Sequence, residues 1–295
     1  MQMEEVKQDS VRAWILAARP KTLTAALIPV VAATALASAD ARFQAIPALL
    51  CAVFASLMQI ASNLINDLYD FQHGNDRSDR LGPERACAQG WISVATMRRG
   101  ILLTLAAACL SGSFLLFYGG WWLIGIGAAC VVFAFLYTTL LASCGLGDLL
   151  VLVFFGFVPV LGTYYVQAGT FTAAALWCGL ACGLVIDTLL VVNNYRDRDA
   201  DKVSGKKTLI VWFGEPFGRY FYLMLGLAAC LCASVLSDYG YGTAGMLPLL
   251  YLLPHVRTWK RMTEIRNGRA LNGILAETSR NMFIFALLLA IGLLL

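Results

Sequence analysis

The chain of 295 residues is 59% hydrophobic and 14% charged, with a net charge of +4 and a mean hydropathy of +0.71. Soluble domains carry about a quarter charged residues, so this chain has too few charges to cover a globule in water. Intrinsic disorder is also excluded, because it requires low hydrophobicity and high charge. One membrane span needs about 20 apolar residues. The composition therefore predicts an all-α, polytopic membrane protein.

Stretches without charged side chains define the expected spans. The longest lies between Arg99 and Arg196, where 96 residues contain only two charges, Asp148 and Asp187. A run of this length holds about four spans, and glycine-rich segments provide the breaks. We predict nine transmembrane helices at 22–39, 45–66, 97–118, 121–141, 148–168, 172–196, 217–237, 241–259 and 276–295. They are expected to form a single domain over 1–295, a bundle of two four-helix halves plus one helix around a central cavity.

The basic residues support this arrangement. With nine spans, 21 of the 22 Lys and Arg residues fall on one face, and only Arg42 falls on the other. The positive-inside rule then places the N-terminus and the basic face in the cytoplasm. The short segment before the first span favours a prokaryotic inner membrane. Residues 1–20 are expected to lie in the membrane interface or simply to begin the first helix in solvent. Because topology accounts for the positive charge, no nucleic-acid partner is expected.

Polar residues at helical spacing end the second and sixth predicted spans. Positions i, i+3 or i+4 and i+7 share one face of a helix. The two stripes are Asn63, Asp67 and Asp70 in the first segment, and Asn194, Asp197 and Asp201 in the second. Both emerge on the basic face and lead into loops predicted at 67–96 and 197–216. Acids at one helix end are often merely solvated, but two matching stripes with amides reaching into the span favour a functional site.

Opposed carboxylates repel one another unless a cation lies between them. Carboxylate and amide oxygens suit Mg²⁺, which typically bridges to the phosphates of a substrate. The same loops supply the basic residues Arg77, Arg80, Arg85, Lys202, Lys206 and Lys207. Together these groups could hold a diphosphate and stabilise it as a leaving group. The alternative for most of the basic residues is that they only set the topology.

At these residues the sequence resembles the UbiA superfamily of intramembrane aromatic prenyltransferases. The hallmark of that superfamily is a pair of motifs, N-x-x-x-D and D-x-x-x-D. Here they are Asn63-x-x-x-Asp67, continuing to Asp70, and Asp197-x-x-x-Asp201. Further similar segments are found at 79–85, 145–148 and 193–197, and they match the branch that prenylates 1,4-dihydroxy-2-naphthoate. The resemblance covers residues 18 to 215, and beyond them it rests on hydrophobicity.

The resemblance implies a Mg²⁺-dependent transfer of a polyprenyl group from a polyprenyl diphosphate to 1,4-dihydroxy-2-naphthoate. Decarboxylation would give demethylmenaquinone, a step of menaquinone biosynthesis. The implied metal ligands are Asp67, Asp70, Asp76, Asp197 and Asp201, of which all but Asp76 are also the implied catalytic residues. The implied substrate-binding residues are Asn63, Asn66, Asn194, Lys21, Arg80, Lys206 and Lys207. Aromatic faces stabilise cations, so Tyr137, Tyr164 and Tyr165 are expected to line the pocket of an allylic cation.

Two features depart from the family pattern. Gly74 stands where many members carry an acid, and Asp76 follows it. Asp187 lies in mid-span, where it could contact the acceptor or serve as a hydrogen-bonded structural residue.

Several functions remain open at this stage. The acceptor could instead be 4-hydroxybenzoate, haem or chlorophyllide, and the chain could be a eukaryotic menaquinone-forming relative. A transporter is a further alternative, but it would place charges near the bilayer centre, and only Asp187 lies that deep.

Overall fold

The computed structural model describes residues 6–74, 81–139 and 144–295, and in these ranges the regular structure is entirely helical. The N-terminal half contains α1 (Val11–Ala18), η1 (Pro20–Thr22), α2 (Leu23–Ala39), α3 (Ala45–Gln72), α4 (Val94–Gly119) and α5 (Leu123–Thr139). The next part contains α6 (Gly147–Val151), η3 (Leu152–Phe157), α7 (Val158–Ala168) and α8 (Ala173–Val203). The C-terminal part contains α9 (Leu209–Ser234), η4 (Val235–Tyr239), α10 (Gly242–Met246), η5 (Leu247–Tyr251), α11 (Leu252–Ile265) and α12 (Leu271–Leu294).

The described chain has seven helical segments long and apolar enough to cross a membrane. The all-α, integral-membrane architecture is thereby confirmed, whereas the count of nine spans stays a prediction. The two remaining predicted spans correspond to shorter helices. The one at 121–141 contains α5, and the one at 241–259 is divided among α10, η5 and α11. Pro248 lies in the 3₁₀ segment there, and proline cannot donate the backbone hydrogen bond of a continuous helix.

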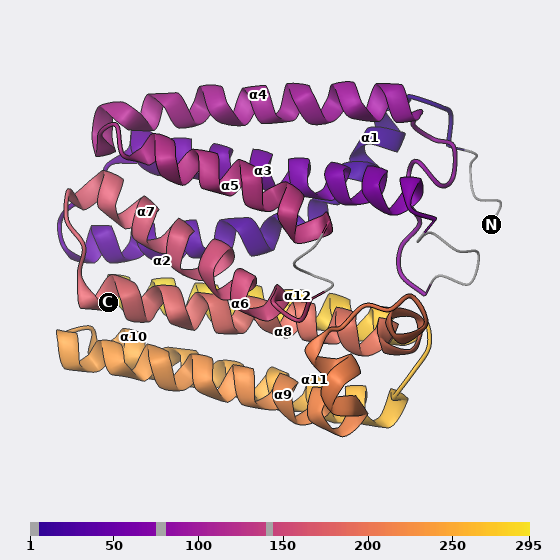
Figure 1. The fold of residues 1–295 in the computed structure, drawn as a ribbon. Coiled ribbons are helices and arrows are strands. Elements are labelled where there is room, and N and C mark those ends of the chain that lie inside the picture. The colour runs from indigo at the N-terminus through magenta and orange to yellow at the C-terminus, as the bar shows by residue number, and fades with distance from the viewer. Residues whose placement is uncertain (1–5, 75–80, 140–143) are drawn as a thin grey trace.

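The helices pack side by side into one bundle, with α4 along one edge and α9 along the opposite edge (Figure 1). Between these edges, α2 contacts α3 and α7 as well as α8 and α12. The largest buried cluster contains many small residues, among them Ala32, Ala33, Cys178 and Ala181, none of which is exposed. Small side chains allow helices to approach closely, which is how membrane helices gain packing contacts.

Two helices extend beyond their predicted spans. The 31 residues of α8 are about 46 Å long at 1.5 Å per residue, whereas the hydrocarbon core of a bilayer is about 30 Å thick. Likewise α3 continues to Gln72. Asp67, Asp70, Asp197 and Asp201 therefore lie on helices, and the connecting loops begin later than the predicted boundaries at 67 and 197.

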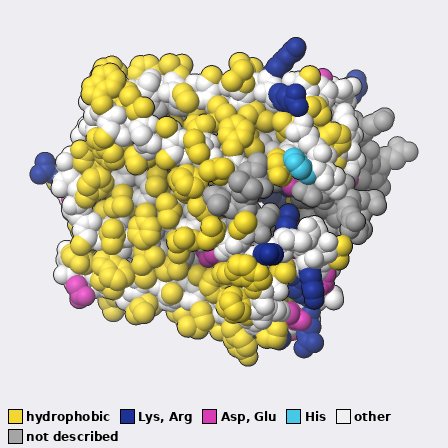
Figure 2. Space-filling model, viewed as in Figure 1, with side chains coloured by type: hydrophobic (Ala, Val, Ile, Leu, Met, Phe, Trp, Pro, Cys, Tyr) yellow, Lys and Arg dark blue, Asp and Glu magenta, His cyan; other side chains and the backbone are white. Residues whose placement is uncertain are grey.

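Side-chain polarity divides the surface of the bundle. In Figure 2 hydrophobic side chains cover most of the visible face, while Lys, Arg and acidic side chains gather mainly at one end. We call this the charged end, and it contains the C-terminal turns of α3 and α8, the α1–α2 junction and the N-terminal turn of α12. The opposite end contains Asp40, Arg42 and Tyr241.

Candidate active site

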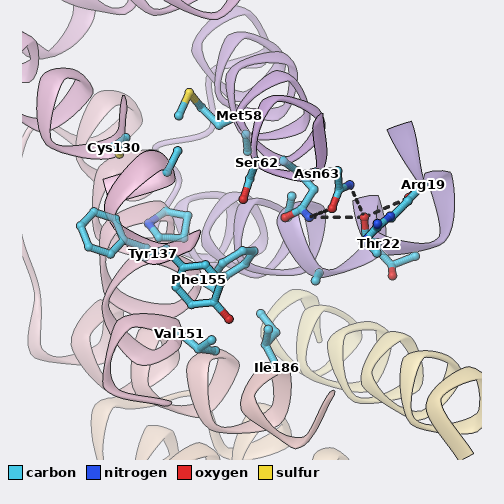
Figure 3. A pocket seen from close by; sticks show the side chains of 18 of the residues that line it. Arg19, Thr22, Met58, Ser62, Asn63, Cys130, Tyr137, Val151, Phe155 and Ile186 are labelled. Carbon is cyan, nitrogen blue, oxygen red and sulfur yellow. Dashed lines mark hydrogen bonds between the residues drawn. The ribbon is translucent and has the colours of Figure 1, made fainter. Parts of the chain in front are cut away.

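A cavity of about 1860 Å³ lies between α2, α3, α4, α5, α8, α12 and the rod formed by α6, η3 and α7. Its walls are largely apolar and include Leu116, Ile126, Phe154 and Val158. Figure 3 shows part of it, with Asn63 on one side and Tyr137, Phe155, Val151 and Ile186 on the wall across from it. The cavity is thus enclosed chiefly by hydrocarbon side chains.

Polar and basic residues line the part of the cavity at the charged end, which we call the mouth. Its basic residues are Arg19, Lys21, Arg85, Arg196, Arg269 and Arg280, and its amides are Gln59, Asn63, Asn66, Asn193 and Asn272. They come from the α1–α2 junction, α3, the segment 81–90, α8, the residues just before α12 and the N-terminal half of α12. A long apolar cavity that ends in positive charge is complementary to a ligand with an anionic head and an apolar tail.

Asn63 of α3 fixes the α1–α2 junction. Its Nδ2 donates a hydrogen bond to Oγ1 of Thr22 at 2.8 Å (Figure 3). The same Nδ2 donates to the carbonyl oxygen of Ala18 at 2.9 Å. Gln59 Nε2 donates to Oδ1 of Asn63 and to Oγ1 of Thr22, both at 3.3 Å. These bonds hold the turn that carries Lys21 at the mouth.

Asp67 and Asp70 anchor the segment 81–90 to α3. Asp67 is 1% exposed, and its two carboxylate oxygens accept the backbone N–H groups of Ala86 at 2.8 Å and Cys87 at 2.9 Å. Nη2 of Arg85 contacts Oδ2 of Asp70 at 2.5 Å and donates to Oδ1 of Asn66 at 3.1 Å. Charge-assisted bonds of this kind are strong, so this motif determines where Arg85 lies.

The second motif, which begins at Asp197, fixes the orientation of an arginine on the same helix, α8. Arg196 donates to both carboxylate oxygens of Asp197, from Nε at 2.8 Å and from Nη2 at 2.5 Å. It also donates to Oδ1 of Asn193 at 2.7 Å and to Oδ1 of Asn272 at 2.8 Å. Asn272 in turn donates to the carbonyl oxygen of Leu81 at 2.8 Å. Arg196 is only 3% exposed, and this network links α8, α12 and the segment 81–90 around it.

The described residues among the predicted site residues fall into three groups: those that line the cavity, those at the charged end that do not line it, and two tyrosines toward the opposite end. Lys21, Asn63, Asn66 and Tyr137 line the cavity. The four motif acids lie at the charged end without lining the cavity: Asp67, Asp70, Asp197 and Asp201. The first three make the bonds described above, and the carboxylate of Asp201 lies 3.7 Å from Nζ of Lys206. On α8, Asn193 lines the cavity in place of the predicted Asn194. The predicted lysines Lys206 and Lys207 do not line it. Asp76 and Arg80 lie outside the described residues.

Tyr164 and Tyr165 extend toward the opposite end of the bundle. The hydroxyl of Tyr164 donates to Asp40, which also accepts from the hydroxyl of Tyr241. The ring of Tyr165 stacks on Phe171 at a centroid distance of 4.6 Å and meets Trp122 edge-on at 5.1 Å. In this structure neither tyrosine lines the large cavity.

Four basic mouth residues did not emerge from the sequence as site residues: Arg19, Arg196, Arg269 and Arg280. For Arg280 a signal was present, because it falls within a predicted span and charged residues in spans are usually functional. For Arg196 the signal was its place directly before Asp197 in the second motif. The start of α12 carries no motif, so only the packing brings Arg269 to the mouth.

The four motif acids at the charged end have the chemistry of a Mg²⁺ site, since carboxylate oxygens are the ligands that this hard cation prefers. Asp70, Asp197 and Asp201 each pair with a basic side chain. Within the described ranges no three His, Cys, Asp or Glu residues are grouped so that they could hold a metal ion. The donor set therefore fits a divalent cation in kind, and a bound cation would compete with Arg85, Arg196 and Lys206 for these carboxylates.

The fold and the sequence match known proteins over nearly their whole length. The model of the UbiA prenyltransferase family matches residues 26–287. The 1,4-dihydroxy-2-naphthoate octaprenyltransferase of Escherichia coli is 33% identical, covering 99% of this chain and 98% of that protein. The solved structure of a UbiA homolog from Aeropyrum pernix has a TM-score of 0.68 at 19% identity, covering 91% of this chain and 96% of the other. That of a homolog from Archaeoglobus fulgidus bound to DMAPP and Mg²⁺ has a TM-score of 0.63 at 15% identity, with coverages of 95% and 98%.

Proposed function

This chain belongs to the UbiA prenyltransferase family, and on that premise we propose that it transfers a polyprenyl group to 1,4-dihydroxy-2-naphthoate. The donor is a polyprenyl diphosphate, and the acceptor loses its carboxylate as CO₂, giving demethylmenaquinone for menaquinone biosynthesis. The acceptor assignment is supported by the relative of that activity, which is similar from end to end.

The observation that carries the proposal is the polarity of the cavity. Ordinary ligand pockets measure roughly 300–1,000 Å³, and the volume here is about 1860 Å³. The cavity therefore has room for a long apolar chain together with an aromatic ring. Its basic mouth matches a diphosphate, and its apolar walls match a prenyl chain. The same walls exclude water, which would otherwise capture an allylic cation.

The basic residues of the mouth would hold the diphosphate oxygens. Arg196 is already oriented by Asp197 and Asn193, and Arg85 is oriented by Asp70 and Asn66. Lys21 adds a third positive charge on the α1–α2 junction. Preorganised donors of this kind stabilise the negative charge that develops on a leaving group. The C–O bond between the prenyl carbon and the diphosphate can then break, with the electron pair leaving on the diphosphate.

We further propose that the motif acids at the charged end, Asp67, Asp70, Asp197 and Asp201, hold Mg²⁺, with Asp76 as an additional ligand. Bound there, the ion would neutralise the diphosphate and make it a better leaving group. The A. fulgidus homolog of similar fold was solved with Mg²⁺ and a prenyl diphosphate, which supports a divalent metal.

The prenyl cation would lie among aromatic side chains. Phe133, Tyr137, Phe154 and Phe155 line the cavity, and the faces of aromatic rings attract cations. The acceptor ring then forms the new C–C bond with the prenyl carbon. We expect the mouth to face the cytoplasm of a prokaryotic inner membrane, because the basic residues gather at that end.

A panel of acceptors tests the proposal. Purified protein is supplied with Mg²⁺ and a polyprenyl diphosphate, and then with 1,4-dihydroxy-2-naphthoate, 4-hydroxybenzoate, haem or chlorophyllide. We expect prenylated product only with the naphthoate, with one CO₂ released for each diphosphate. Chelation of Mg²⁺ should stop the reaction, and added Mg²⁺ should restore it. Preference for another acceptor would overturn the naphthoate assignment.

A pair of variants tests the site. Asp197→Ala should lower the transfer rate by about 100-fold or more, because it removes a proposed metal ligand and the carboxylate that orients Arg196. Asp238→Asn is the control, since Asp238 is an exposed acid in η4, away from the cavity. Equal activity in the two variants would contradict the proposed role of the second motif.

A further inference from the structure

A second polar cluster lies in the cavity wall, away from the mouth. It consists of Tyr137 near the end of α5, Asp148 in the first turn of α6 and Asp187 in the middle of α8. Tyr137 lines the cavity and interacts electrostatically with both carboxyl groups. Asp148 and Asp187 are 8% and 1% exposed. The binding of a diphosphate at the mouth does not require this cluster.

Close helix packing brings these residues together. The α6–η3 rod packs against α8, and Gly156 faces the backbone of Gly179 and Gly183 so closely that a Cβ atom on it would lie 2.6 Å from the oxygen of Gly179. Residues 152–157 form a π-helical turn just before Pro159, which has no N–H to continue the regular pattern. Turns of this type are frequent at functional sites.

Asp187 differs from the other buried acids in its hydrogen bonding. Asp67 has both oxygens bonded to backbone N–H groups, and Asp40 accepts from two tyrosine hydroxyls. Among the described acids, only Asp187 has a buried oxygen, Oδ1, without a hydrogen-bond partner. An acid retained only to link helices would have its oxygens bonded, because an unpartnered buried oxygen is costly. The unpartnered oxygen therefore indicates that Asp187 gains a hydrogen-bond partner when a ligand binds, either the ligand itself or a side chain that the ligand reorients.

The depth of the cluster suits the aromatic acceptor. Asp187 precedes Asn193 by six residues on α8, which is roughly 9 Å along the helix. The reacting prenyl carbon is bonded to the diphosphate, so the acceptor ring must lie within about 3.5 Å of that carbon. The ring consequently belongs directly below the mouth, at the level of Tyr137, and not at the far end of the prenyl chain.

We propose that Tyr137, Asp187 and Asp148 form the subsite for a ring hydroxyl of the aromatic acceptor. This inference rests on the proposed function. The Tyr137 hydroxyl contacts the acceptor hydroxyl, and Asp187 is a positioning residue that orients Tyr137 together with Asp148. In this arrangement the Tyr137 oxygen accepts the hydrogen bond that the ring hydroxyl donates. Such a bond increases the electron density of the ring, which favours its attack on the prenyl carbon. The subsite also selects hydroxylated rings over rings without a hydroxyl group, because the latter would leave its polar groups unpaired.

The test separates the acceptor from the donor by steady-state kinetics. The variants are Asp187→Asn and Tyr137→Phe, of which the second retains the aromatic ring in the cavity wall. Each should raise the KM for the acceptor by roughly 10-fold or more, while the KM for the polyprenyl diphosphate stays within about twofold. The matched controls are Asp40→Asn and Tyr241→Phe, an acid–tyrosine pair at the opposite end of the bundle, and neither should change either KM.

Thermal unfolding of each variant identifies a merely structural role. If both variants lower the melting temperature and change both KM values equally, or change neither, the inference is overturned. Tyr137→Phe decides the outcome if Asp187→Asn does not fold. A wild-type protein that prenylates a different hydroxylated ring contradicts the naphthoate assignment alone, and the KM comparison is then made with that ring. A wild-type protein that prenylates no hydroxylated ring overturns both proposals.

Discussion

Asp67 on α3 and Asp197 on α8 occupy similar places near the ends of two helices that reach the charged end. Their surroundings differ. Asp67 is 1% exposed and bonds to the backbone 19 and 20 residues further along the chain. The side chain of Asp197 is 25% exposed and bonds to the adjacent Arg196. The first motif thus organises a distant segment, whereas the second orients a side chain at the mouth.

Because of this difference, we expect changes in the two motifs to affect the stability of the protein differently. A change in the first motif releases the segment 81–90 and should destabilise the protein as well as the site. A change at Asp197 removes the carboxylate that neutralises and orients Arg196 while leaving the backbone in place. Variants of the two motifs should therefore be similar in activity but different in thermal stability.

Asp67→Ala is expected to have the largest effect. It removes the acceptor of two buried N–H groups and should cost roughly 4 kcal/mol of unfolding free energy, because each unpaired buried group costs about 1–3 kcal/mol. The measurement is thermal or denaturant unfolding in detergent, with Asp197→Ala as the matched variant. Equal unfolding free energies for the two variants would contradict the distinction between the motifs.

Arg85→Gln should follow in size. Arg85 and Asp70 are buried partners at 2.5 Å, and removing one member of a buried pair costs about 3–5 kcal/mol. The double variant Asp70→Asn, Arg85→Gln should lose less than the sum of the two single variants, since no buried charge is then left uncompensated. Strictly additive losses would show that the two side chains do not depend on each other.

Arg196→Gln should act mainly on catalysis. The loss of one oriented donor at the leaving group is expected to lower kcat/KM for the polyprenyl diphosphate by about 100-fold, or about 2.7 kcal/mol. Arg261→Gln is the control, because Arg261 is an arginine on α11 that pairs with Glu277 and does not line the cavity. If Arg196→Gln retains its activity but unfolds at a lower temperature, Arg196 is a structural residue.

Lys206→Gln is expected to have the smallest effect. The lysine side chain is 35% exposed and lies 3.7 Å from Asp201, and exposed ion pairs contribute about 1 kcal/mol or less. We expect a change in kcat/KM of no more than about fivefold. A loss comparable to that of Arg196→Gln would instead support the implied role of Lys206 in holding the diphosphate.

Local properties of the sequence were sufficient to predict the helical membrane fold and the position of its polar end. Runs of apolar residues must cross the bilayer as helices, because no water is present there to bond the backbone. Helical periodicity also places Asn63, Asp67 and Asp70 on one face of α3, since that spacing is a property of the helix itself.

The tertiary structure decided which of these faces turn toward the cavity and what lies opposite them. Asn193 rather than Asn194 lines the cavity because packing sets the rotation of α8 about its axis. For the same reason Thr163 of α7 lines the cavity and its neighbour Tyr164 does not. The bond between Asn272 and Leu81 joins residues 191 positions apart, and no local pattern encodes such a contact. The breaks at Pro248 and in the π-helical turn likewise depend on neighbouring helices, which satisfy the backbone and fill the space that the irregular turns create.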